Sequence, residues 1–352
     1  MGSNVNVIGI VGGLGNEAMV DLARKIILVQ GFAGNSYLFY GNSRLAYKAH
    51  EVGRQWKPDD EPELRKRATA EHTARMMQFF GCGPVGLSCN SAHELFREVM
   101  ASLPLTFVDM IHETARSLEG VGMKVLVLGV DSLLNSGLYH RALEQYGIEA
   151  VSPSSSNMVK VMSAIYDTEF GIKTAKITPE SENLLCGVIR EECQRQGCGA
   201  VVLGCTELPL ALTPESCARF KEQGLIPSEL MVVDASAVLA KSLVNAGGHA
   251  ASFDSLDMTP AAHVDWFAPA TFRLDTLDEL VKVQDDIIRL SVEYLASKGR
   301  KIEGSYMHLP TLFAVGDVPG FSEKAAEIGV KVFDAESDLG AVLPDMFDKH
   351  YG

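Results

Sequence analysis

Three short patterns recur in the same order along this 352-residue chain, and this internal repeat constrains the fold more than any other feature. The recurring pairs are 8–12 and 125–129 (offset 117), 87–90 and 203–206 (offset 116), and 107–109 and 232–234 (offset 125). Matches in one order at similar offsets indicate two homologous units. The repeat therefore predicts two α/β lobes related by a pseudo-twofold axis.

Short apolar runs alternate with amphipathic stretches throughout the repeats. Buried strands are expected at 5–11, 37–40, 85–87, 105–108, 124–128, 200–203 and 231–233, and helices at 17–29, 67–80, 92–102, 136–146 and 180–196. Near-continuous apolar strands that alternate with helices are typical of mostly parallel sheets covered on both faces. We expect lobe 1 to comprise residues 1–113 with 208–248, and lobe 2 to comprise residues 114–207.

A C-terminal extension, residues 249–352, follows the repeats. Its last 102 residues carry 18 acidic and 9 basic side chains and so supply −9 of the net charge of −14. Thr276 and Glu279 form a capping-box pattern, and the stripe that follows predicts a helix over 276–297 that buries Leu277, Val281, Ile288 and Leu295. Strand, helix and strand are expected at 312–315, 322–328 and 330–333. The sequence predicts a small acidic α/β extension that contributes no proton-transfer group and either packs beside the cleft or takes part in a subunit contact.

The overall charge and the cysteine pattern exclude several functional classes. The excess of 45 acidic over 31 basic residues argues against nucleic-acid binding, which needs a basic surface. No stretch of about 18 uncharged apolar residues predicts a membrane span, and the N-terminal segment has no signal-peptide pattern. The seven cysteines contain no C-x-x-C pair, which argues against a disulfide scaffold or a zinc ribbon. We expect a cytoplasmic protein with free thiols and no membrane partner.

A glycine-rich turn follows the first expected strand. Residues 13–18 (GLGNEA) fit the G-x-G-x-x-A pattern of dinucleotide sites. Such sites also need an acidic residue at the end of the second strand, and none occurs here before Glu51. We therefore favour a loop whose amides and helix N-terminus face a small carboxylate.

Cys89 and Cys205 occupy matching places in the two repeats, just past the carboxyl end of a strand. Open parallel sheets bind their ligands at that edge. A thiolate accepts a proton and a thiol donates one, so two facing thiols can remove a proton from one side of a carbon and return it to the other. We predict that the two sulfurs face each other across a cleft between the lobes. Single cysteines elsewhere are expected to be small buried apolar residues.

These motifs resemble those of the cofactor-independent aspartate/glutamate racemases over about residues 5–248. Residues 8–15 are similar to the opening of that family. Residues 89–93 (CNSAH) resemble its first cysteine motif, C-N-T-A-H, and residues 203–209 (LGCTELP) match its second. Glu207 is the residue that the aspartate racemase branch carries after the Thr.

The resemblance implies that Cys89 and Cys205 are the two acid/base residues of an amino-acid racemase with an acidic substrate, and that it uses no pyridoxal phosphate and no metal. It implies a homodimer and a substrate held by backbone amides, Asn90 and Thr206, with Arg44 or Lys173 on the side-chain carboxylate. The full set of substrate-binding candidates is Gly13, Leu14, Arg44, Asn90, Ser91, Lys173 and Thr206. His93 and Glu207 are supporting candidates that either orient the thiols or make structural hydrogen bonds.

Two departures from the family pattern keep other functions open. Val130 and Leu133 stand where the family usually carries threonines near the substrate. One alternative is another isomerase or a decarboxylase of the same superfamily that uses one thiol, either as an acid/base or as a nucleophile. The other is a non-catalytic protein that binds a small molecule on this scaffold.

Overall fold

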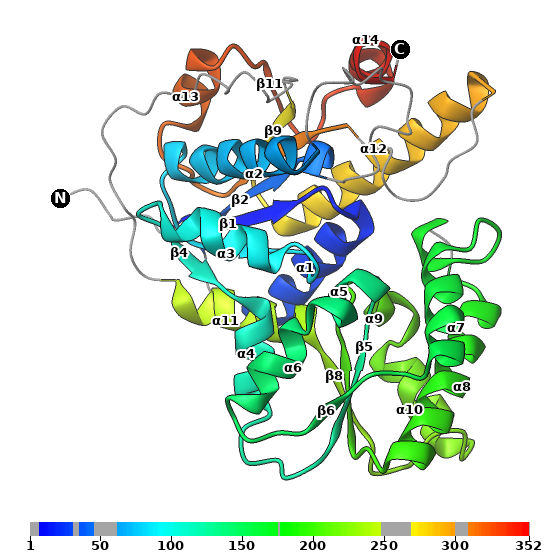
Figure 1. Cartoon of the computed structure of the whole chain (residues 1–352). Coiled ribbons are helices and arrows are strands. Elements are labelled where there is room, and N and C mark those ends of the chain that lie inside the picture. Colours follow the sequence, from blue (N-terminus) through cyan, green and yellow to red (C-terminus); the bar gives the residue numbers. More distant parts are fainter. Residues whose placement is uncertain are drawn as a thin grey trace. The chain divides into compact units, whose positions relative to one another are not determined.

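The computed structural model describes residues 7–30, 35–45, 62–174, 177–247, 269–299 and 309–351. Contacts divide the chain into two compact units. Unit 1 comprises Met1–Ser88, Leu95–Val108 and Ala240–Gly352, and unit 2 comprises Cys89–Glu94 and Asp109–Leu239. Both units are α/β, as the strand–helix alternation predicts (Figure 1). The predicted lobes assign Cys89 to the first lobe, whereas contacts group it with Cys205 in unit 2.

The sheet of unit 1 has seven strands in the order β11-β9-β10-β2-β1-β3-β4. Their bounds are β1 Val7–Gly12, β2 Ser36–Gly41, β3 Cys82–Leu87, β4 Thr106–Val108, β9 Ala270–Leu274, β10 Thr311–Val315 and β11 Val332–Phe333. Strands β1 to β4 are parallel, and β1, β2 and β3 are buried along their whole length. Burial on both faces explains why these strands are continuous apolar runs.

The helices that cover this sheet are α1 Asn16–Gln30, α2 Pro62–Phe79, α12 Leu277–Ser297, α13 Phe321–Glu327 and α14 Leu339–Tyr351, and a short 3-10 helix, η1, spans Ser43–Leu45. The chain passes from β1 to β2 on one side and from β2 back past β1 to β3 on the other. Right-handed crossovers therefore place α1 and α2 on opposite faces of the sheet. The division between the units falls within α3 His93–Ala101 and α11 Ala235–Ala246.

The sheet of unit 2 repeats the strand order of the first. Its order is β6-β5-β7-β8, all parallel, which corresponds to β2-β1-β3-β4. The strands are β5 Val125–Leu128, β6 Ala150–Val151, β7 Ala200–Leu203 and β8 Met231–Asp234. The same backbone bond follows the third strand in both: Ser88 N donates to Val11 O at 2.9 Å, and Gly204 N donates to Leu128 O at 2.6 Å. The internal repeat is thus real at the level of strand order and hydrogen bonding.

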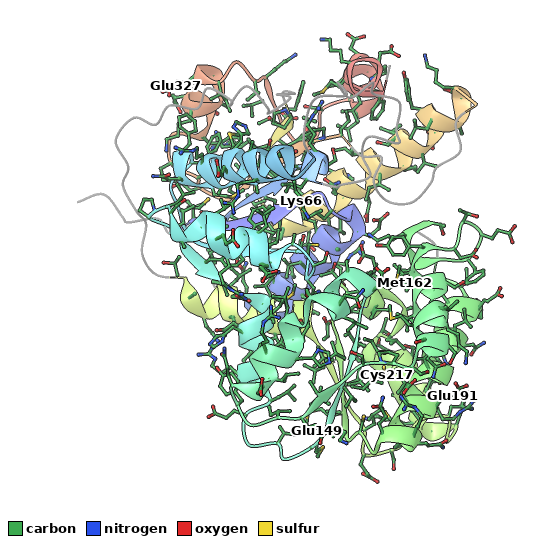
Figure 2. All side chains as sticks on the ribbon, viewed as in Figure 1. Lys66, Glu149, Met162, Glu191, Cys217 and Glu327 are labelled. Atoms are coloured by element: carbon green, nitrogen blue, oxygen red, sulfur yellow. The ribbon has the colours of Figure 1, made fainter. Side chains whose placement is uncertain are left out.

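The helices of unit 2 are α4 Met110–Ser117, α5 Asp131–Ser136, α6 Leu138–Glu144, α7 Ser155–Tyr166, α8 Pro179–Gln196, α9 Leu208–Ala211 and α10 Pro214–Glu222, with a 3-10 helix, η3, at Ile172–Thr174. In Figure 1, α4 and α6 lie on one side of the sheet and α8 and α10 on the other. Met162 on α7, Glu191 on α8 and Cys217 on α10 mark this second side in Figure 2.

One buried carboxylate fastens α7 to α8 within unit 2. Glu192 has a fully buried side chain, and its Oε1 accepts bonds from Ser154 N at 2.7 Å and Asn157 Nδ2 at 2.8 Å. Arg195 and Gln196 donate to its other oxygen. These bonds satisfy a charge that would otherwise be costly to bury.

The C-terminal extension is built into the sheet of unit 1. The run β9-α12-β10-α13-β11 has the strand order β10-β9-β11, which is the order β2-β1-β3 again. Strand β10 pairs antiparallel with β2 from Thr311↔Gly41 to Val315↔Tyr37, and parallel with β9. The extension is therefore a third βαβαβ unit, joined edge to edge to the first.

Helix α12 begins as predicted and buries a slightly different stripe. Thr276 is its N-cap and accepts a bond from Glu279 N, while Glu279 accepts from Asp275 N rather than from the N-cap residue. Leu277 and Leu295 are buried as expected, whereas Val281 and Ile288 are only half-buried. The helix packs on α1, so its buried face is rotated toward its other apolar and small residues, Leu280, Val283, Ile287 and Ser291.

Candidate functional site

The loops that follow β3 and β7 both contribute to unit 2, and each begins with a predicted cysteine. Cys89 follows Ser88 at the end of β3 and is half-buried, and Cys205 follows Gly204 at the end of β7 and is buried. Strand β7 is held in a parallel ladder between β5 and β8, which fixes where its loop starts. The charges of Glu207 and Lys173 act on both thiols. Unit 2 thus brings both cysteines under the influence of one charged pair.

The Cys89 loop is held by a buried histidine. His93 Nε2 accepts the backbone N–H of Met110 at 3.2 Å, so Nδ1 carries the hydrogen and donates to Cys89 O at 2.6 Å. His93 has no exposed surface. It therefore positions the loop through the backbone, while Ser91 Oγ lies 3.5 Å from the thiol of Cys89.

Asn90 is fixed by a residue that the motifs did not single out. Tyr139 of α6 donates its hydroxyl to Asn90 Oδ1 at 2.6 Å, and both side chains are buried. Asn90 Nδ2 is buried and has no hydrogen-bond partner. An unsatisfied buried amide N–H costs free energy, so this donor is available to a ligand oxygen. The only sequence signal for Tyr139 is its place on the inward face of the predicted helix 136–146.

Cys205 faces a buried ion pair. Its sulfur donates to Glu207 Oε2 at 2.9 Å, and Glu207 Oε1 accepts from the ammonium of Lys173. The side chains of Lys173 and Glu207 are only 4% and 5% exposed, so water screens this pair poorly. Thr206 Oγ1 also lies 3.3 Å from Glu207 Oε2. Glu207 is thus shared by a thiol, a hydroxyl and an ammonium.

A tight turn brings Lys173 to this position. Gly171 N donates to Asp167 O at 3.0 Å, and a Cβ at residue 171 would overlap the backbone of Asp167, so only glycine fits. The following 3-10 helix η3 packs against α9, which begins directly after Glu207. The Lys173 ammonium also lies 5.7 Å from the ring centre of Tyr166, within cation–π range. The predicted segment 171–173 thus delivers its cation to the second cysteine loop.

The two thiols differ in how strongly the ionised form is disfavoured. Burial raises the pKa of Cys89; the Glu207 charge adds to that rise, and the Ser91 hydroxyl and the Lys173 charge partly offset it. Burial raises the pKa of Cys205 well above its usual value; the Glu207 charge and hydrogen bond raise it further, and the Lys173 charge offsets a part. The pKa of Glu207 is lowered: burial would raise it, but the Lys173 charge and the Cys205 and Lys173 hydrogen bonds outweigh burial. Cys205 is therefore a thiol beside an ionised carboxylate.

Three predicted residues, Gly13, Leu14 and Arg44, belong to unit 1. Gly13 has φ +99°, and a Cβ there would overlap the backbone of Asn42, whose N–H donates to Gly12 O at 3.1 Å. The close approach of two strand ends thus explains one glycine of the dinucleotide-like pattern. Leu14 is half-buried on the turn before α1, and guanidinium atoms of Arg44 are buried, with the Arg44 charge acting on Tyr40. Glu51 lies outside the described residues.

The two positions without the family threonines are packed apolar sites. Val130 is the N-cap of α5, where its side chain makes no capping bond, and it is 7% exposed. Leu133 is 1% exposed, and its side chain would meet a Cβ at Gly129 or Gly204. The described part of unit 2 therefore offers no hydroxyl at either position.

Among the described residues, no three His, Cys, Asp or Glu side chains are grouped as metal ligands. The five cysteines outside the motifs are buried. None of the helices in the described ranges is both long and apolar enough to cross a membrane. His263 and His308 of the extension lie outside the described residues.

The comparison with protein families matches one family over much of the chain. The profile of the Asp/Glu/hydantoin racemases matches residues 59–243. The broad specificity amino-acid racemase RacX of Bacillus subtilis (strain 168) is 23% identical over 240 residues, which cover 68% of this chain and 97% of RacX.

Solved structures give the same fold. An aspartate racemase homologue from Pyrococcus horikoshii OT3 matches with a TM-score of 0.54 and 20% identity, over 68% of this chain and 98% of that one. The aspartate racemase of Picrophilus torridus matches with a TM-score of 0.52 and 22% identity, over 68% and 93% of the two chains. Each relative is matched over nearly its whole length, and about a third of this chain is additional.

Proposed function

Because the chain belongs to the Asp/Glu/hydantoin racemase family, we propose that it is an amino-acid racemase in which Cys89 and Cys205 remove and return the proton at Cα. Family membership supports racemase activity and hence an isomerase. The observation that carries the two-cysteine mechanism is that both thiols, from corresponding loops of the repeat, experience the same Lys173–Glu207 pair. Among the described residues, no other pair of cysteines lies at corresponding positions just after a strand in the two repeats.

In this mechanism one cysteine acts as a thiolate and the other as a thiol. The thiolate takes the Cα proton, which breaks the C–H bond and forms an S–H bond, and the thiol then delivers its own proton to the opposite face. The intermediate carries a developing negative charge next to the α-carboxylate. Preorganised donors lower the barrier to forming it, and the buried Nδ2 of Asn90 is one such donor. The reaction needs no pyridoxal phosphate or metal in this proposal.

We propose an acidic substrate, aspartate or glutamate, as the sequence suggests. Its side-chain carboxylate needs a cation, and the candidates are Arg44 in unit 1 and Lys173 in unit 2. The Lys173 ammonium has three donors, so it can keep Glu207 and still bind a second carboxylate. A homodimer and a cytoplasmic location complete the proposal, and light scattering on the purified chain tests the first.

The apolar character of Val130 and Leu133 favours one second candidate, a superfamily isomerase or decarboxylase that uses a single thiol. One experiment separates the two. L- and D-amino acids are incubated with the protein in deuterated water and analysed by chiral chromatography and mass spectrometry. A racemase yields the opposite enantiomer with one deuterium at Cα. Unchanged enantiomers across the panel, acidic and neutral, would contradict the proposal.

A further inference from the structure

The Lys173–Glu207 pair does more than the family resemblance assigns to it. The resemblance gives the lysine to a substrate carboxylate, yet without substrate Lys173 is bound to Glu207 in a nearly unexposed ion pair. Glu207 in turn accepts the thiol hydrogen of Cys205 through its other oxygen, at 2.9 Å. The chain of contacts therefore runs from ammonium to carboxylate to thiol.

We propose that Lys173 and Glu207 are positioning residues that keep Cys205 as the thiol in the resting enzyme, so that Cys89 is the cysteine that starts as the base. The proposal rests on the two-cysteine racemase proposed above. It adds which of the two cysteines is the base in the resting enzyme.

The contact geometry supports this assignment. A carboxylate accepts hydrogen bonds but donates none, so a sulfur 2.9 Å from an ionised Glu207 needs its proton. Loss of that proton would place two negative charges side by side in a site with little water. Lys173 keeps Glu207 ionised, because a buried carboxylate without a counter-charge would itself take up a proton.

The first loop lacks this arrangement. The neighbour of the Cys89 sulfur is the Ser91 hydroxyl at 3.5 Å, and a hydroxyl can donate to a thiolate. Cys89 is also half-buried rather than buried, so water can stabilise its ionised form. The partner beside Cys89 can therefore stabilise a thiolate, whereas the partner beside Cys205 requires the sulfur to keep its proton.

The remaining ionisable groups near Cys205 do not reverse this order. Tyr139 of α6 is a neutral phenol whose pKa burial raises, and it is influenced by Asp109, Asp234 and Cys205. The carboxylates Asp109 and Asp234 cap α4 and α11 through backbone N–H groups. Lys173 is the cation that acts on both thiols, so it cannot favour Cys205 alone.

The readout must come from the thiols and not from catalytic efficiency. Because two enantiomers have equal free energy, the equilibrium constant of racemisation is one, and kcat/KM is equal in the two directions whatever the resting protonation. The substrate-free protein is therefore alkylated with iodoacetamide between about pH 7 and pH 10, the range in which thiols titrate. Tandem mass spectrometry of the peptides gives the alkylation midpoint of each cysteine. The pH midpoint of alkylation reports where the thiolate forms. Restricted access to a buried thiol, by contrast, slows alkylation by the same factor at every pH and leaves the midpoint unchanged.

In the wild-type chain the Cys89 midpoint should lie below that of Cys205. Glu207→Gln should lower the Cys205 midpoint by about one pH unit or more, which corresponds to about tenfold faster alkylation at neutral pH. Lys173→Met should shift the Cys205 midpoint in the same direction as Glu207→Gln, because Glu207 without its counter-charge takes up a proton and no longer repels a thiolate. Ser91→Ala is the matched control, since it should raise the midpoint of Cys89 and leave that of Cys205 unchanged.

Three results would overturn the proposal: a Cys205 midpoint below that of Cys89, no shift in Glu207→Gln, or no shift in Lys173→Met. The last would mean that the lysine serves only a substrate. If Glu207→Gln does not fold because Lys173 is left without its counter-ion, the double variant Lys173→Met/Glu207→Gln removes both charges and should still lower the Cys205 midpoint. These titrations use no substrate, so a failure of the racemase proposal would appear separately, as absent turnover in the wild type.

Discussion

The two repeats share a backbone but differ in the side chains at corresponding points. Each places a cysteine just past its third strand and an aspartate at the start of the helix after its fourth strand. Around Cys89 the partners are a hydroxyl and a histidine that holds the backbone, and around Cys205 they are a carboxylate and an ammonium. Equivalent backbone positions in the two repeats therefore carry different partners for their thiols.

The largest effect is expected from the cysteines themselves. Cys89→Ala and Cys205→Ala should each lower racemisation by at least about a hundredfold, because one face of Cα then lacks its acid or base. Each variant should still exchange the α-proton of one enantiomer with deuterated water, and the two variants should retain opposite enantiomers. Cys217→Ala, on α10, is the control that should keep activity. Wild-type racemisation by either cysteine variant would remove the proposed equivalence of the two loops.

Gly13 and Val130 occupy corresponding places after β1 and β5, and only the first requires glycine. Gly13→Ala should destabilise the protein by about 2–4 kcal/mol, because φ is +99° and the new Cβ would overlap the backbone of Asn42. Gly329→Ala has φ +72° but no atom within 4 Å of the new Cβ, so it should cost about 1 kcal/mol. Urea unfolding followed by circular dichroism measures both. If both variants lose the same unfolding free energy, the backbone around residue 13 moves enough to accommodate the new Cβ without cost.

The two units also differ in the contacts that hold their helices together, and the stability of the contact in unit 2 should depend on acid pH. Burial opposes the ionised form of Glu192, but its hydrogen bonds with Ser154, Asn157 and Arg195 outweigh burial and lower the pKa to about 2. The folded pKa lies below the unfolded value, so this stabilisation is full above about pH 4.5 and is lost as the pH falls toward about 2. Glu192→Gln should therefore cost on the order of 2 kcal/mol at pH 7 and much less near pH 3.

The corresponding test in unit 1 uses the ion pair between α1 and α12. Arg24 and Asp285 are 2.9 Å apart, and their side chains are 50% and 51% exposed. Asp285→Asn should change the unfolding free energy by less than about 0.5 kcal/mol at pH 7, because water screens an exposed pair. A loss as large as that of Glu192→Gln would contradict the distinction between a buried and an exposed helix contact.

The aspartate caps should behave alike in the two repeats. Asp109 Oδ1 accepts from Ile111 N and His112 N at 3.0 and 3.1 Å, and Asp234 Oδ1 accepts from Ser236 N and Ala237 N at 2.8 and 3.2 Å. Asp109→Ala and Asp234→Ala should each cost about 1 kcal/mol in urea unfolding. A difference of more than about 1 kcal/mol between them would show that the repeats have diverged in their caps as well.

The smallest effect concerns Val130, the uncapped start of α5. Val130→Thr should change stability by less than about 0.5 kcal/mol, because Ser132 N already donates to Asp131 Oδ1 and Leu133 N to Val130 O, so neither needs a new cap. Thermal unfolding measures the change, and a larger loss would show that the apolar packing of Val130 is worth more than a hydroxyl at this place. The same variant tests whether a hydroxyl at this place alters turnover on acidic substrates.

The sequence was sufficient for the parts of the fold that repeat or are continuously apolar. The recurring segments predict two homologous α/β lobes, and β7 lies at Ala200–Leu203 as expected. Helix α7 was missed: no element was expected over residues 155–166, although Met158, Val161, Met162 and Ile165 recur at helical spacing. The place of the extension was not predictable either, since the pairing of β10 with β2 leaves no local pattern.

The site shows the same limit. Local motifs pointed to the loops at Cys89 and Cys205, whose spacing along the chain is short and characteristic. They did not show that Tyr139 holds Asn90 or that Lys173 binds Glu207, because each pair is far apart in the sequence. A contact between distant segments depends on the packing of α6 and η3, and a single sequence carries no trace of it. Their contribution to the site is known only from the structure.

The pairing of β2 with β10 also sets an order of events during synthesis. Residues 109–239 of unit 2 leave the ribosome before any strand of the extension exists, and their four-stranded sheet pairs only within this range. The six-residue edge of β2 must instead wait for residues 311–315 near the end of the chain. Until then it presents unpaired N–H and C=O groups, which are a template for pairing with another nascent chain. Unit 1 is therefore the part of the newly made chain most in need of protection by a chaperone.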